Sequence, residues 1–106
     1  MSQMGMRVVE DKREQIVELC KRYHVQRLEL FGSALRDDFQ VSSSDLDFLV
    51  EFNPLTQGSY ADTYLGLQNA LESLFNRTVD LVEVQAIQNP YYREEIERTK
   101  VLIYAA

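Results

Sequence analysis

Residues 45–52 form the clearest strand pattern in the chain, because an apolar side chain occupies every second position. These apolar positions are Leu46, Phe48, Val50 and Phe52. Asn53 and Pro54 end the pattern, since proline cannot donate a hydrogen bond to a neighbouring strand. A strand with one apolar face requires partner strands and a covering layer, so this segment predicts a sheet with other elements packed on it.

Helix and strand patterns alternate along the rest of the chain. Helices are expected at 11–24 and 60–76 and from Pro90 onwards, with a short helical turn at 34–39. Strands are expected at 25–31 and 78–84, loops at 40–44 and 57–59, and a short last strand or an apolar tail at 101–104. This order predicts one small domain over residues 1–106, of the α/β or α+β class, with helices packed on a sheet.

The composition is that of an ordinary globular domain, with 45% hydrophobic and 26% charged residues. The net charge of −6 has the wrong sign for holding a phosphate backbone, so direct binding of nucleic acid is not expected. The longest apolar run, 101–106, is far shorter than the roughly 20 residues of a membrane helix. The first residues lack the apolar stretch of a secretory signal. The chain is therefore expected in the cytoplasm, without membrane attachment.

The single cysteine and the single histidine are not expected to carry chemistry. Cys20 lies on the apolar stripe of the first expected helix, where a buried thiol is usually inert. His24 ends that helix and has no cysteine, histidine or aspartate near it at a spacing typical of metal ligands.

Two acidic residues interrupt the start of the clearest strand. Asp45 and Asp47 are two residues apart, so both carboxylates lie on the same face, with Cα atoms about 6.5–7 Å apart. A third acid, Asp80, lies between apolar residues in the strand expected at 78–84. If the two strands are neighbours, the three carboxylates converge on a two-cation site of the kind used for phosphoryl or nucleotidyl transfer. A simpler interpretation is that these acids form a solvated face.

A possible phosphate site follows the strand at 25–31. Gly32 allows close approach to the backbone, and the Ser33 hydroxyl and nearby backbone N–H groups can hold phosphate oxygens. Arg36 lies three residues later as a forked donor for the same anion. A Gly-Ser pair alone is weak evidence, but its order relative to the acidic strand is more informative.

This ordered arrangement resembles a known family. The segments are Leu30-Phe31-Gly32-Ser33-Ala34-Leu35-Arg36, the spacing 34–44, and Ser44-Asp45-Leu46-Asp47-Phe48-Leu49-Val50. Together they look like the signature of the minimal nucleotidyltransferases of the DNA polymerase beta superfamily. The first expected helix, the third acid in Thr78-Val79-Asp80-Leu81-Val82 and the ending Val101-Leu102-Ile103-Tyr104 resemble the family as well.

The resemblance implies a nucleotidyltransferase fold with a small mixed β-sheet flanked by helices. It also implies a site in which Asp45, Asp47 and Asp80 are the catalytic residues and ligate Mg²⁺. The nucleotide-binding residues are then Gly32, Ser33, Arg36 and Ser44, with ATP as the substrate. Many family members have a glycine after the arginine, whereas this chain has Asp37 followed by Asp38. These negative charges could neutralise Arg36 or repel a triphosphate.

Small stand-alone members of this family are commonly the antitoxin of a toxin–antitoxin pair whose toxin is a HEPN ribonuclease. The resemblance therefore implies a hetero-oligomer with the toxin. It also implies that AMP is transferred from ATP to a tyrosine hydroxyl of the toxin, and that this modification inactivates the toxin. Tyr60, Tyr64, Tyr91 and Tyr92 are candidates for a contact patch, although tyrosines at helical spacing are more often core residues.

Two alternatives stay open at this point. A binding module could neutralise the toxin by covering its active site, with the three acids retained but idle. A transferase that modifies a small molecule such as an aminoglycoside would normally need a longer chain.

Overall fold

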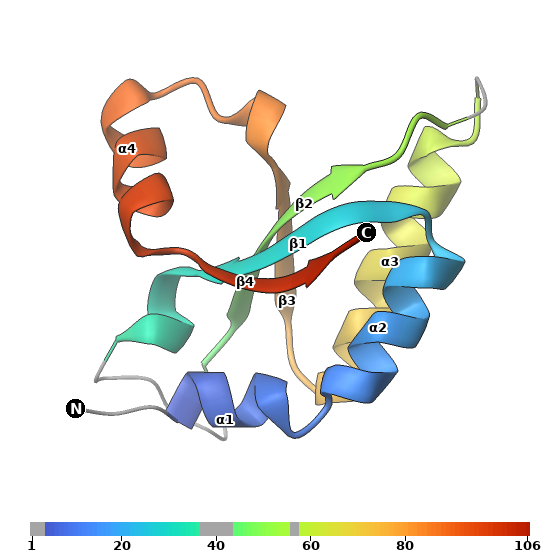
Figure 1. Cartoon of the computed structure of the whole chain (residues 1–106), viewed down its shortest axis with the longest axis horizontal. Coiled ribbons are helices and arrows are strands. Elements are labelled where there is room, and N and C mark those ends of the chain that lie inside the picture. Colours follow the sequence, from blue (N-terminus) through green and yellow to red (C-terminus); the bar gives the residue numbers. More distant parts are fainter. Residues whose placement is uncertain (1–3, 37–43, 56–57) are drawn as a thin grey trace.

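The computed structural model describes residues 4–36, 44–55 and 58–106. Its elements are α1 (Met4–Glu10), α2 (Arg13–Arg22), β1 (Val25–Phe31), the short 3-10 helix η1 (Gly32–Leu35), β2 (Leu46–Phe52), α3 (Tyr60–Phe75), β3 (Val79–Glu83), the 3-10 helix η2 (Val84–Ala86), α4 (Pro90–Thr99) and β4 (Val101–Ala105) (Figure 1). Residues 37–43, which include Asp37, Asp38 and most of the expected loop at 40–44, lie outside the described residues. The same holds for Gln57 in the expected loop at 57–59.

The four strands form one mixed sheet in the order β3-β2-β1-β4. β1 pairs antiparallel with both β2 and β4, whereas β2 and β3 run parallel, joined by the crossover helix α3. This confirms the expected α/β architecture, a small mixed sheet flanked by helices. The segment 101–104 is a strand at the sheet edge and not a loose tail.

The closed face of the sheet is the one that α2 and α3 cover. Its core consists of residues of β1, β2, β3 and β4 that alternate along the strands, together with residues of the two helices: Ile16, Cys20, Leu28, Leu30, Leu46, Phe48, Val50, Leu67, Leu71, Phe75, Val79, Leu81 and Ile103. Cys20 is fully buried there, and burial raises the pKa of its thiol to about 12. The expectation of a buried thiol is therefore confirmed.

The open face is the opposite one, which carries the other half of the strand residues. A smaller apolar cluster of Phe31, Leu49, Ile87 and Ile96 joins α4 to it. Asn89 caps α4 by accepting hydrogen bonds from the backbone N–H groups of Tyr91 and Tyr92 at 2.9 and 3.2 Å. Pro90 at the first helical position was the sequence signal for this start. Because α4 joins the open face only through this small cluster, the helix leaves part of that face uncovered.

Helix α1 is the main element that the sequence pattern does not predict. The expected helix at 11–24 is shorter, Arg13–Arg22, and α1 precedes it. Val9 of α1 is fully buried, and Gly5 lies directly on η1, since a Cβ at Gly5 would be 2.0 Å from the Ala34 carbonyl oxygen. With only seven residues, α1 is too short for a clear periodic signal and depends on this tertiary contact. Within the described residues, no helix is both long and apolar enough to cross a bilayer.

Candidate active site

The turn from β1 into η1 is built around Gly32. Gly32 has φ +75°, a left-handed conformation that residues with a Cβ rarely adopt. A Cβ at this position would also lie 2.3 Å from Oδ2 of Asp47. Glycine is therefore required twice here, for the backbone conformation and for the close approach of the carboxylate.

Ser33 ties this turn to the start of β2. Its hydroxyl donates a hydrogen bond to the Asp45 carbonyl oxygen at 3.0 Å, and its backbone N–H donates to Asp47 Oδ2 at 3.4 Å. Sequence reasoning treated both groups as phosphate donors. In the structure each has a protein acceptor, so the first role of Ser33 is to position the two aspartates against the glycine turn.

The sheet brings Asp47 and Asp80 together. They are register partners on the parallel strands β2 and β3, and Phe31, next to Gly32, is the partner of Asp47 on β1. Val79 and Leu81 face the closed side, so Asp80 projects from the open face with Asp47. Asp45 precedes β2 by one residue and is exposed. The expected adjacency of the two acid-bearing strands is thus confirmed.

Asp47 is the most perturbed of the three carboxyl groups. Partial burial raises its pKa, and the negative charges of Asp80 and Asp45 raise it further. The Ser33 N–H group and the Arg36 guanidinium lower the pKa of the same carboxyl, but the net shift is upward. The arrangement therefore concentrates negative charge that a bound cation would relieve.

The donor chemistry fits magnesium. Mg²⁺ prefers carboxylate oxygens, and a divalent cation reverses the repulsion that raises the pKa of Asp47. However, no three Asp, Glu, His or Cys side chains within residues 4–36, 44–55 and 58–106 lie close enough together to hold one metal ion. The residue types and their register are thus in place, while a closed set of three ligands is not seen in this part of the chain.

A pocket of about 280 Å³ lies beside Asp47, between η1 and α4. Its lining includes three of the residues predicted to bind nucleotide, namely Gly32, Ser33 and Arg36. The remaining lining residues are Asp47, Phe31, Leu35, Tyr92, Glu95, Ile96 and Thr99. The pocket thus combines a polar side, with Arg36 as its basic residue and Asp47 and Glu95 as its acidic residues, and an apolar side that suits a base.

The wall formed by α4 was missed by sequence reasoning. Tyr92 lines the pocket, is 50% exposed, and has a hydroxyl whose pKa is raised by partial burial and by the charges of Asp47 and Asp80. The cap at Asn89 signalled where α4 begins, but no spacing in the sequence indicates that α4 returns to Gly32. Arg77 was also missed: its guanidinium donates to the Ser44 carbonyl oxygen at 2.8 Å and so positions the residue before Asp45.

The four tyrosines named as a contact patch do not form one surface. Tyr64 donates a hydrogen bond to the Leu81 carbonyl oxygen, and Tyr60 donates to Glu83 Oε2 at 2.5 Å. Both lie on α3, on the closed side of the sheet, whereas Tyr91 and Tyr92 lie on α4. Tyr60 and Tyr64 therefore serve local structure in part, and the α4 pair is the more exposed one.

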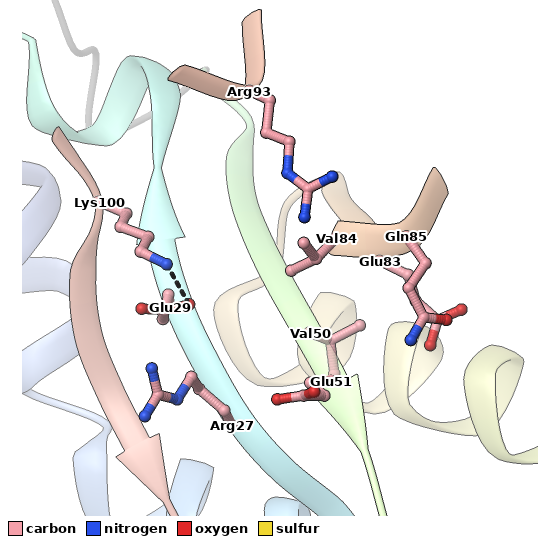
Figure 2. A pocket seen from close by; sticks show the side chains of 9 residues that line it. All are labelled: Arg27, Glu29, Val50, Glu51, Glu83, Val84, Gln85, Arg93 and Lys100. Carbon is pink, nitrogen blue, oxygen red and sulfur yellow. Dashed lines mark ion pairs between the residues drawn. The ribbon is translucent and has the colours of Figure 1, made fainter. Parts of the chain in front are cut away.

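A second pocket, of about 260 Å³, lies farther along β1 and β2. Figure 2 shows Arg27 and Arg93 on β1 and α4 at this pocket, together with an ion pair in which Lys100 Nζ is 3.2 Å from Glu29 Oε1. Three basic side chains (Arg27, Arg93, Lys100) and three acidic ones (Glu29, Glu51, Glu83) line it, so their formal charges cancel. None of the residues predicted for catalysis lines this pocket, and the candidate chemistry lies in the first one.

Comparison with known proteins identifies the family. Residues 12–103 match the family model described as the nucleotidyltransferase domain. Two candidate protein adenylyltransferases of Methanocaldococcus jannaschii, MJ0126 and MJ0128, are 32% and 35% identical to this chain. The alignments cover 81% and 80% of this chain and 84% and 83% of the two relatives.

Solved structures show the same fold. A candidate minimal nucleotidyltransferase superimposes with a TM-score of 0.71 at 32% identity, over 90% of this chain and 92% of that one. The antitoxin in a complex described as tri-AMPylated Shewanella oneidensis HEPN toxin with MNT antitoxin is a more distant match. It has a TM-score of 0.62 and 17% identity, over 92% of this chain and 72% of the matched chain.

Proposed function

This chain belongs to the nucleotidyltransferase domain family, and we propose that it transfers AMP from ATP to a tyrosine hydroxyl of a HEPN-family ribonuclease toxin and thereby neutralises the toxin. The reaction is proposed to depend on Mg²⁺ and to take place in the cytoplasm. The observation that carries the proposal is the register of Asp47 and Asp80 on parallel strands, beside a glycine turn that opens into a pocket.

The residues of the site have distinct proposed roles. Gly32 and Arg36 contact the triphosphate, Ser33 holds Asp47 in place, and Ser44 completes the nucleotide site at the start of β2. Asp45, Asp47 and Asp80 are the proposed ligands of Mg²⁺, which when bound neutralises charge on the phosphates during transfer. Asp80 orients the incoming hydroxyl and receives its proton as the oxygen attacks the α-phosphorus and pyrophosphate leaves.

The acceptor is proposed to be a separate protein. The pocket of about 280 Å³ lies between η1 and α4. The relatives named as candidate protein adenylyltransferases and the toxin–antitoxin complex with an AMPylated toxin support an acceptor of this kind. A net charge of −6 also suits a basic, RNA-cleaving partner better than it suits RNA.

Intact-mass spectrometry tests the proposal. A purified HEPN-family protein incubated with this chain, ATP and Mg²⁺ is expected to gain one or more AMP units. The matched control is Asp47→Asn, which keeps the size and the acceptor for the Ser33 N–H group but removes the charge. Transfer is expected to fall more than about 100-fold in this variant, since even residues outside the first ligand shell cost 10- to 100-fold.

The same experiment separates catalysis from neutralisation by binding. Addition of EDTA is expected to stop the mass gain without dissociating the complex. A toxin that is inhibited but gains no mass, with equal inhibition by Asp47→Asn, would contradict the transfer reaction and favour the alternative in which this chain acts as a binding module.

A further inference from the structure

Tyr92 is the tyrosine of this chain that lies beside the candidate chemistry. Its side chain lines the same pocket as Gly32, Ser33 and Asp47, on the wall that α4 contributes. It is 50% exposed, and none of the hydrogen bonds found within the described residues engages its hydroxyl group. The proposed reaction requires an accessible tyrosine hydroxyl near these carboxylates, and the chain places one of its own there.

Two contacts hold the first part of α4, which carries Tyr92, against the sheet. Asn89 accepts a hydrogen bond from the Tyr92 backbone N–H at 3.2 Å, which fixes the residue in the first turn of α4. Ile96, one turn further on, is buried against Phe31 and Leu49 of the sheet. Tyr92 and Asp47 line the same pocket, from α4 and from β2. Tyr92 is thus an ordered part of the pocket and not a side chain on a loose end.

We propose that Tyr92 is an internal acceptor, and that the chain AMPylates this residue when ATP is bound and no partner protein occupies the pocket. This inference rests on the proposed transfer reaction. The Tyr92 Oη atom attacks the α-phosphorus of ATP, the Oη–P bond forms, and the bond to the β-phosphate oxygen breaks. Pyrophosphate leaves, and the hydroxyl proton passes to Asp80 or to water.

The adduct would act as a block on the site. A nucleotide attached to Tyr92 stays in a pocket whose other walls are Arg36, Leu35 and Ile96. A second ATP then competes with a tethered nucleotide at high effective concentration. A partner that covers α4 shields Tyr92 from modification. The adduct is therefore expected only on chains that bound ATP before they bound their partner.

The neighbouring residue provides a matched control. Tyr91 is in the same turn of α4, is 83% exposed and is not among the residues that line the pocket. We expect purified wild-type chain with ATP and Mg²⁺ alone to gain one AMP unit, located at Tyr92 by peptide fragmentation. Tyr91→Phe is expected to gain the same unit, whereas Tyr92→Phe gains none.

A mixing experiment tests whether the acceptor is internal. Active chain is incubated with ATP and a size-tagged Asp47→Asn chain that retains Tyr92. Internal transfer modifies only the active chain, at a rate independent of protein concentration. Modification of the tagged chain, or an adduct at any other residue, would overturn the proposal.

The proposed function and this inference fail separately. If a HEPN-family protein gains AMP under conditions in which this chain alone gains none, Tyr92 is not an internal acceptor and the transfer function stands. If neither protein gains mass, the transfer function itself is wrong and the inference falls with it.

Discussion

The two faces of the sheet are made by the same strands and have opposite properties. On the closed face, Leu28, Leu30, Leu46 and Phe48 are fully buried under α2 and α3. On the open face the neighbouring positions carry Asp47, Asp80, Arg27 and Glu29, with only a small apolar cluster beneath α4. Strand alternation therefore lets one set of hydrogen-bonded strands supply a core on one side and a charged surface on the other.

The two faces contribute to the free energy of folding with opposite sign. Burial of apolar side chains on the closed face favours folding, whereas the crowding of carboxylates around Asp47 opposes it through repulsion and partial desolvation. The open face can hold this unfavourable charge because the closed face stabilises the strands independently. Substitutions on the two faces are thus expected to differ in kind as well as in size.

The largest effect is expected for Phe48→Ala on the closed face. Phe48 is fully buried, with its ring centroid 6.1 Å from that of Phe75. Loss of this ring leaves a cavity and is expected to lower the free energy of unfolding by about 3–5 kcal/mol, as measured by urea unfolding. The control is Leu102→Ala on the edge strand, where the side chain is 48% exposed and the change should stay within about 0.5 kcal/mol. Similar losses at both positions would contradict the division between the faces.

An intermediate effect is expected for Gly32→Ala at the turn beside the site. Gly32 and Gly58 both have positive φ, +75° and +88°, so alanine costs about 1–2 kcal/mol of backbone strain at either position. Only at Gly32 does the new Cβ meet another group, Asp47 Oδ2, whereas nothing lies within 4 Å at Gly58. Gly32→Ala is therefore expected to lower stability further and to reduce transfer, while Gly58→Ala lowers stability alone. Urea unfolding measures the stability of the two variants, and a transfer assay measures their activity. If Gly32→Ala and Gly58→Ala lose the same stability and the same activity, the approach of Asp47 to the turn is unimportant.

The smallest effect is expected in the pH dependence of Asp47→Asn. The folded state raises the pKa of Asp47 above its ordinary value of 3.8, so the unfolded chain ionises first as pH rises. Asp47 thus contributes stability below pH 3.8 that is lost as pH rises through the folded-state pKa. Asparagine does not titrate. The stability of Asp47→Asn relative to wild type should increase as pH rises from below 3.8 through the folded-state pKa, measured by urea unfolding at several pH values. A decrease in this relative stability over that range would show that folding lowers the pKa of Asp47 instead of raising it.

The positions of β1, β2 and β3 were largely predictable from the apolar patterns in the sequence, whereas the order and pairing of the strands come from the structure. The face that carries Asp47 followed from alternation alone, and the adjacency of Asp80 was a conditional expectation that the parallel pairing of β2 and β3 confirms. That the three acids bind Mg²⁺ and act in catalysis stays a prediction.

The parts that escaped prediction depend on contacts between distant residues. The short helix α1 leaves no periodic signal and is held by the contact of Gly5 with Ala34. Tyr92 reaches the pocket only because Ile96 packs on Phe31 and Leu49. The acceptors of Ser33 and the position of Arg77 beside Ser44 likewise depend on how η1, β2 and the end of α3 come together.

The register between β2 and β3 has a consequence for the uniformity of the protein in solution. A slip of one residue would turn Asp80 into the core and expose Val79 and Leu81, because side chains alternate between the faces. Such a molecule would not stay folded, so misregistered chains are removed by unfolding and do not persist as inactive, native-like forms. In a preparation of this protein that has not been exposed to ATP, the fraction of molecules competent for chemistry is therefore expected to equal the folded fraction.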